Sequence, residues 1–137
     1  MGARPASWVL PDLPASREVR PSAKMRARET ETETETEQRR MANRDKLSNE
    51  AIEAFIAGHA GWTRAGDMLV KTFSFAHYGQ GMGFAVHVGF AAEKRDHHPN
   101  LHIFWGKVTV EWSTHDAGGI TRVDTEMAEL TDHIYAG

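Results

Sequence analysis

The chain contains no cysteine among its 137 residues, which excludes a disulfide framework and a thiolate metal site. It also lacks any run of the roughly eighteen apolar residues that a membrane-spanning helix needs, so we expect no membrane partner. The N-terminus lacks the basic and then apolar order of a secretory signal. We therefore expect a cytoplasmic protein.

Basic clusters are lacking from the larger part of the chain. Residues 41–137 hold eight Lys/Arg and twelve Asp/Glu, together with all eight histidines. A mildly acidic domain without a Lys/Arg cluster argues against nucleic acid as a direct partner. The length permits one ordinary domain at most.

Residues 1–40 differ in composition from the rest of the chain. They contain four of the five prolines and a strict alternation of Glu and Thr over residues 29–37. This repeat offers no apolar face to bury, and Thr is a poor helix former, so we expect a disordered low-complexity extension. An organellar targeting segment is one explanation, although its acidic residues count against it. We favour a mis-assigned start, with Met41 as the first residue of a domain over 41–137.

Hydrophobic spacing and turn residues predict the elements of that domain. Ser48 is placed to cap a helix, and Pro99 disfavours helical geometry at His98, so the central helix should end near His97. Gly106-Lys107 suits a two-residue hairpin turn that would direct Trp105 and Trp112 into the core. The expected elements are a helix at 49–57, strands at 62–64 and 68–75, a helix at 78–96, strands at 101–105 and 108–112, and a helix from 121 with a stripe of Val123, Met127, Leu130 and Ile134.

The element order is therefore helix, two strands, helix, two strands, helix. Two hairpins predict an α+β fold with a four-stranded antiparallel sheet, whose apolar face is covered by three helices. The exposed sheet edges could serve as an oligomer contact.

Three histidines and nearby carboxylates form the clearest candidate site. His97 and His98 are adjacent at the exit of the central helix, and His115 follows the last strand. Glu93 lies one turn before His97 and could orient it, or could simply be solvated. Asp124 could act in the site, or could cap the last helix. Imidazole is suited to proton transfer near neutral pH, so the residues indicate a site for acid–base chemistry.

A zinc site is the competing use of three histidines. The pair is adjacent rather than four residues apart on a helix, and neither HExxH nor a helical His-x-x-x-His occurs. We therefore expect no metal.

Much of residues 46–135 resembles the pterin-4a-carbinolamine dehydratase family. One departure is His77-Tyr78, where the family often has Asp-Phe. Residues 1–40 have no counterpart in the family pattern. The matching motifs are Gly61-Trp62, Phe73-x-Phe75, Met82-Gly83-Phe84, Ala92-Glu93-x-x-Asp96-His97-His98-Pro99, Trp105-Gly106-Lys107-Val108 and Ser113-Thr114-His115-Asp116-x-Gly118-Gly119-Ile120-Thr121-x-x-Asp124.

The resemblance implies a dehydratase that removes water from a 4a-hydroxytetrahydropterin, the product of aromatic amino acid hydroxylases, and gives the quinonoid dihydropterin. It implies no metal and no cofactor, a pterin substrate, and a homodimer or homotetramer. The catalytic positions would be His97, His98 and His115, of which His98 would chiefly bind substrate. The substrate-binding or orienting positions would be Glu93, Asp96, Ser113, Thr114 and Asp124.

Within that set, Ser113 and Thr114 would offer backbone hydrogen bonds to the pterin ring. Glu93 and Asp124 would orient or tune the imidazoles. The family also contains proteins that act as dimerisation cofactors of a transcription factor, so a non-catalytic binding or assembly module on the same fold is the alternative function. The complete set of histidines favours the enzyme.

Overall fold

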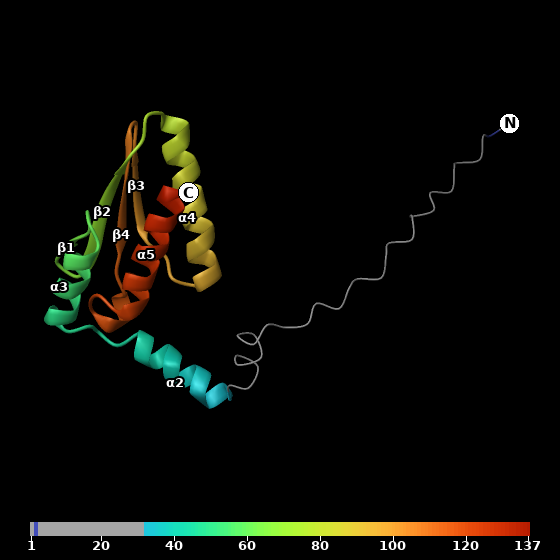
Figure 1. Cartoon of the computed structure of the whole chain (residues 1–137). Coiled ribbons are helices and arrows are strands. Elements are labelled where there is room, and N and C mark those ends of the chain that lie inside the picture. The colour runs from blue at the N-terminus through green and yellow to red at the C-terminus, as the bar shows by residue number, and fades with distance from the viewer. Residues whose placement is uncertain (1, 3–31) are drawn as a thin grey trace. The chain divides into compact units, whose positions relative to one another are not determined.

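A computed structural model describes residue 2 and residues 32–137 of the chain. The chain divides between Glu33 and Thr34 into two units, and the fold below is that of the second. Figure 1 shows the elements in chain order. They are α2 (Glu33–Asn43), α3 (Asn49–Gly58), β1 (Thr63–Ala65), β2 (Met68–Ser74), α4 (Tyr78–Arg95), β3 (Asn100–Phe104), β4 (Lys107–Trp112), the short 3₁₀ helix η1 (His115–Ala117) and α5 (Arg122–Ala136).

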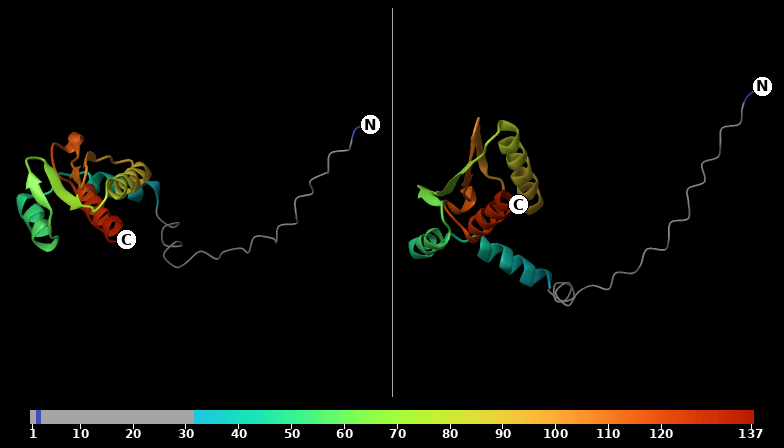
Figure 2. Two further views of the ribbon diagram at one scale, coloured as in Figure 1. Left: turned by 90° about the horizontal axis from the view of Figure 1, so that it is seen from above. Right: turned by 45° about the horizontal axis from the view of Figure 1, so that its top comes forward.

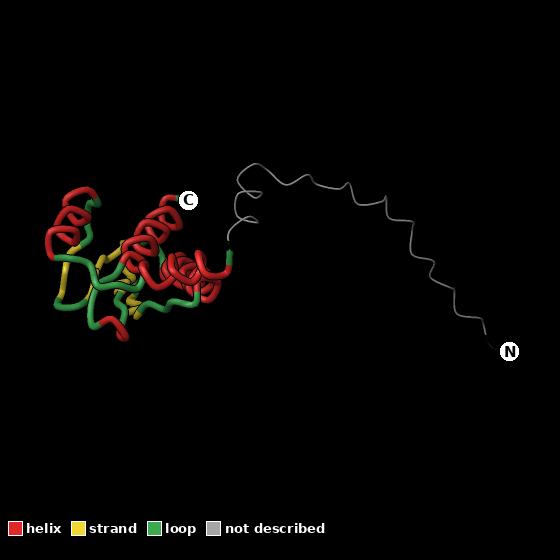
Figure 3. Tube along the Cα trace, turned by 90° about the horizontal axis from the view of Figure 1, so that it is seen from below, coloured by secondary structure: helices red, strands yellow, loops and turns green. Residues whose placement is uncertain are grey.

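The four strands form one antiparallel sheet in the order β1-β2-β4-β3. Helices α3, α4 and α5 lie on the same side of this sheet (Figures 2 and 3). The predicted α+β fold and element order are therefore confirmed. Residues 32–137 contain four α-helices rather than three, because α2 precedes the predicted set.

Helix α2 includes the last part of the Glu/Thr repeat, where the sequence favoured no regular structure. Every described side chain of this helix except Asn43 is exposed. Glu35 lies four residues before Arg39, and this order of charges stabilises a helix. Residues 1 and 3–31 of the predicted disordered extension lie outside the described part of the chain. The domain boundary at Met41 stays a prediction.

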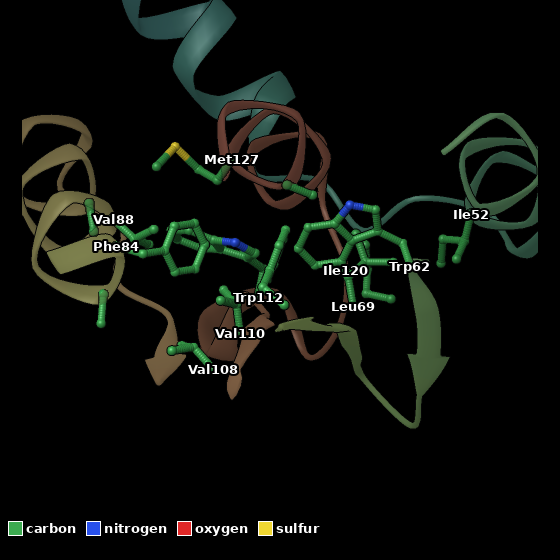
Figure 4. Close-up of a cluster of buried hydrophobic side chains, with 14 residues drawn as sticks. Ile52, Trp62, Leu69, Phe84, Val88, Val108, Val110, Trp112, Ile120 and Met127 are labelled. Atoms are coloured by element: carbon green, nitrogen blue, oxygen red, sulfur yellow. The ribbon is translucent and has the colours of Figure 1, made fainter. Parts of the chain in front are cut away.

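The core lies between the sheet and the helices. Figure 4 shows Ile52 of α3, Phe84 and Val88 of α4, and Met127 of α5 with the buried strand residues. Ser48 caps α3, because its Oγ accepts the backbone N–H of Ala51 at 3.2 Å. The buried face of α5 differs in part from the predicted stripe. Leu130 is exposed, while Asp124, Met127, Ala128 and Thr131 are buried.

Polar side chains fix α5 onto the sheet. Asp132 accepts the indole N–H of Trp62 at 2.9 Å and the ammonium group of Lys71 at 2.7 Å. Trp112 of β4 is fully buried, and its indole N–H donates to the Thr131 hydroxyl at 3.1 Å. These contacts hold the C-terminal half of α5 against β2 and β4.

The β3–β4 hairpin corrects one sequence expectation. Phe104 pairs with Lys107, so the turn consists of Trp105 and Gly106, and Trp105 is 73% exposed instead of lying in the core. The register is shifted by two residues from the predicted one, so each strand keeps the same faces. The turn is anchored on β2, because the carbonyl of Gly106 accepts the N–H of Phe75 at 2.9 Å.

A chain that begins at Met41 should fold as stably as the full chain, because most of α2 is exposed and contributes nothing to the hydrophobic core. We expect thermal midpoints that agree within about 2 °C. A chain that begins at Ala60 is the control, since it lacks the buried Ile52 and should melt far lower. A large fall in the midpoint of the Met41 chain would show that the extension packs onto the domain.

Candidate active site

The C-terminus of α4 sets the direction of the histidine pair. Asp96 adopts the left-handed conformation, with φ of 55°, which Asp tolerates better than most residues. Its N–H donates to the carbonyl of Glu93, and the N–H of His97 donates to that of Ala92, both at 3.1 Å. This pair of bonds ends the helix as a Schellman motif does. The chain then turns from the helix into β3.

The His97 side chain is held from two sides. Its Nε2 lies 2.5 Å from Oδ1 of Asp124, and its ring stacks on Trp112 with centroids 5.7 Å apart. The Asp124 side chain is completely buried, and that of His97 is 17% exposed. A pair in this position is screened far less by solvent than a surface pair. The structure therefore brings together two of the predicted site residues that are 27 positions apart.

Asp124 also starts α5. Its Oδ2 accepts the backbone N–H of Thr121 at 2.9 Å, which is one half of a capping box. The same oxygen accepts the Thr114 hydroxyl at 2.8 Å. The sequence left a capping role and a site role as alternatives. Oδ2 makes the capping contact, and Oδ1 contacts His97.

The loop after β4 presents His115. Thr114 and Gly119 pair through their backbones, with N–H to carbonyl distances of 3.1 Å and 3.3 Å. Gly118 closes the loop with φ of 71°, a conformation that favours glycine. His115 begins η1 and is exposed. The N–H and the carbonyl of Thr114 are both bonded inside the loop, so they are not free for the predicted backbone contact with a ligand.

These segments enclose a cleft of about 640 Å³, a volume within the range of small-molecule sites. Six of the eight predicted site residues line it, and Glu93 and Asp124 contact lining histidines from outside. The lining residues from the predicted set are Asp96, His97, His98, Ser113, Thr114 and His115.

The His98–Glu93 pair differs from the His97–Asp124 pair in its exposure to solvent. Nε2 of His98 lies 2.6 Å from Oε1 of Glu93, but the two side chains are 55% and 74% exposed. An ion pair this accessible contributes little to stability. Of the two histidines, only His97 is fixed by buried contacts.

Sequence reasoning missed several residues of the cleft. Lys94 and Arg95 were part of the quoted motif without a role, although both line the cleft and Arg95 pairs with Glu126 at 2.6 Å. Nothing in the sequence indicated that α2 and the residue after it reach the site. The further lining residues are Thr36, Arg39, Asn43, Arg44, Asp116 and Val123.

The histidine and carboxylate side chains at the cleft are suited to proton transfer. Two imidazoles are each paired with a carboxylate, and a third is open to solvent. Among residues 32–137, no three His, Asp or Glu side chains are grouped as ligands for a metal ion.

No helix in this part of the chain has the length and apolarity needed to cross a bilayer.

Fold and site together define an α+β protein with a histidine-lined cleft. The sequence profile of the family described as pterin 4 alpha carbinolamine dehydratase matches residues 45–134. The chain belongs to this family.

Three similar proteins illustrate the relationship. A protein of Natronomonas pharaonis, provisionally named pterin-4-alpha-carbinolamine dehydratase, is 44% identical over 66% of this chain and 96% of its own length. A protein of Roseiflexus sp. with the same provisional name is 42% identical over 65% of this chain and 96% of its own. The crystal structure of a "transcriptional coactivator/pterin dehydratase" from Brucella melitensis has a TM-score of 0.64 and 26% identity, and covers 66% of this chain and 99% of its own.

Replacing Asp124 with Asn should destabilise the fold strongly. The amide cannot accept hydrogen bonds on both sides, so donors that now meet the buried carboxylate would lose their partner. We expect a loss of about 3 kcal/mol in the free energy of unfolding in urea. Asp116→Asn is the control, because Asp116 lines the same cleft but is exposed, and it should change stability by less than about 0.5 kcal/mol. Equal stability of the two variants would contradict the structural role of Asp124.

Proposed function

We propose that the protein is a 4a-hydroxytetrahydropterin dehydratase, a hydro-lyase that releases water and the quinonoid dihydropterin. The supporting observation is that three histidines line one cleft and that the His97 ring is held by a buried carboxylate. Family membership supplies the substrate class. The role would be to recycle the pterin cofactor of aromatic amino acid hydroxylases in the cytoplasm, with the protein as a homodimer or homotetramer.

The reaction requires two proton transfers. N5 of the pterin loses its proton, and the electron pair forms the double bond to C4a while the bond from C4a to the hydroxyl breaks. The hydroxyl takes up a proton and leaves as water. The proton count therefore balances without a redox partner, and one general base with one general acid suffices.

The contacts of His97 suggest the base. A carboxylate only accepts hydrogen bonds, so Nε2 of His97 must carry the hydrogen that points to Oδ1 of Asp124. Nδ1 is then the acceptor of the neutral ring and the atom that would take a proton. The negative charge of Asp124 stabilises the imidazolium that forms. Nδ1 of His97 would therefore accept the proton that N5 of the pterin loses.

His115 would supply the proton to the leaving hydroxyl. It is exposed at the start of η1 and lines the same cleft as His97. His98 would chiefly bind substrate, as would Asp96 and Ser113, while Glu93 would orient His98.

The alternative is a binding or assembly module. The Brucella structure is described as that of a transcriptional coactivator/pterin dehydratase, and this chain exposes the large side chains of Phe90 and Trp105, at 71% and 73%. The complete histidine set favours catalysis, because a module that only binds a partner has no need of it.

The variant His115→Ala should lose dehydration activity while remaining folded. General acids contribute about 10²–10⁴-fold to a rate, and an exposed side chain contributes little to stability. The measurement is turnover of a carbinolamine generated in the assay, after subtraction of the enzyme-free rate. His102→Ala is the matched control, since His102 is an exposed histidine paired with Glu111 outside the cleft. Unchanged turnover in His115→Ala would refute the assigned role.

Catalysed dehydration should survive exhaustive treatment with a chelator. The proposed steps need only imidazoles, and the sequence offers neither cysteine nor a helical His-x-x-x-His. We expect less than about a twofold change in the catalysed rate. Loss of activity that added zinc restores would contradict the mechanism, and His97, His98 and His115 would then be reassigned as ligands.

A further inference from the structure

Behind the His97–Asp124 pair lies a buried pair of threonine hydroxyls that the mechanism has not used. Oγ1 of Thr114 lies 2.8 Å from Oδ2 of Asp124 and 2.9 Å from Oγ1 of Thr121. Thr121 is completely buried and Thr114 is 9% exposed. No buried side-chain nitrogen or oxygen in the described residues lacks a partner. Every buried polar side-chain atom in this network of Asp124, Thr114 and Thr121 therefore has a hydrogen-bond partner.

Counting hydrogens fixes the direction of this chain. The carboxylate of Asp124 has none to give, so the single hydroxyl hydrogen of Thr114 points to Oδ2. The hydroxyl of Thr121 then donates to Thr114 at 2.9 Å, because its own distance to Oδ2 is longer, at 3.3 Å. Together with the backbone N–H of Thr121, these donors occupy Oδ2 and leave Oδ1 for His97.

Thr114 also belongs to the other wall of the cleft. Its backbone pairs with Gly119, and the next residue is His115. One residue therefore connects the loop that presents His115 to the carboxylate that orients His97. A change in the Thr114 side chain alters the support of Asp124 without removing any group that would meet substrate.

We propose that Thr114 is a positioning residue, which acts through Asp124 to hold His97 as the Nε2–H tautomer with Nδ1 ready to accept a proton. For its effect on turnover, this proposal rests on the dehydratase function proposed above. Its effect on the tautomer of His97 is independent of that function. The Thr121 hydroxyl supports the same arrangement indirectly, through its hydrogen bond to the Thr114 hydroxyl.

The test compares Thr114→Val, which keeps the shape and removes the hydroxyl, with Thr114→Ser, which keeps the hydroxyl. Thr109→Val is the control, because Thr109 of β4 also shares a hydroxyl–hydroxyl hydrogen bond with another threonine, Thr72, but lies outside the cleft and away from Asp124 and Trp112 in the hydrogen-bond network. We expect Thr114→Val to lower kcat by about 10-fold with KM within about twofold, the size of effect typical of hydrogen bonds that orient a functional histidine. Thr114→Ser should recover kcat to within about threefold of the parent.

The second readout is ¹⁵N NMR of the His97 ring, assigned by its loss in His97→Ala. The parent, Thr114→Ser and Thr109→Val should show the Nε2–H tautomer, and Thr114→Val a mixture of both tautomers. An unchanged tautomer and kcat in Thr114→Val would overturn the proposal, as would an equal loss of kcat in Thr109→Val. If Thr114→Val fails to fold, Thr121→Val decides, since it should show a smaller change in the same direction, and no change there refutes the proposal. If the parent shows no dehydration at all, the proposed function fails, and the NMR comparison still decides the role of Thr114.

Discussion

The arrangement of the site depends on one buried carboxylate, that of Asp124. One oxygen receives the N–H of Thr121, the N-cap of α5, and a threonine hydroxyl, and the other meets the ring of His97. Burial of an ionised group is costly unless it is hydrogen-bonded, and here each oxygen has a donor. The same contacts that satisfy the charge therefore join the start of α5 to the end of α4. Stability of the fold and orientation of His97 are consequences of a single set of bonds.

The rest of the fold supplies a frame for that carboxylate. Trp112 of β4 lies beneath the His97 ring and is fixed in turn by the Thr131 hydroxyl of α5. The left-handed Asp96 ends α4 at the point where the next residue meets the carboxylate. Exposed side chains such as His98 and His115 complete the cleft without contributing to this frame, so they can be changed at little cost to stability.

Local signals were sufficient to predict the elements and the histidines, but not their contacts. The cap by Ser48 and the helix end before Pro99 could be predicted because each depends on a few neighbouring residues. The position of Trp105 could not, because a turn displaced by one residue shifts the register by two and keeps the same alternation. The observed turn is held by the N–H of Phe75, which is distant in sequence. Asp124 both caps α5 and contacts His97. The second contact joins residues 27 positions apart, and no local spacing predicts it.

A double-mutant cycle of kcat/KM with His97→Ala and Asp124→Asn tests most directly whether Asp124 acts on the reaction through His97. Groups that act as a unit give strongly non-additive effects, whereas independent groups give effects that multiply. The account predicts that, measured on the folded fraction, the double variant is as slow as His97→Ala alone, within about twofold. A double variant slowed by the product of the two single effects would contradict it, because Asp124 would then act on the reaction without His97.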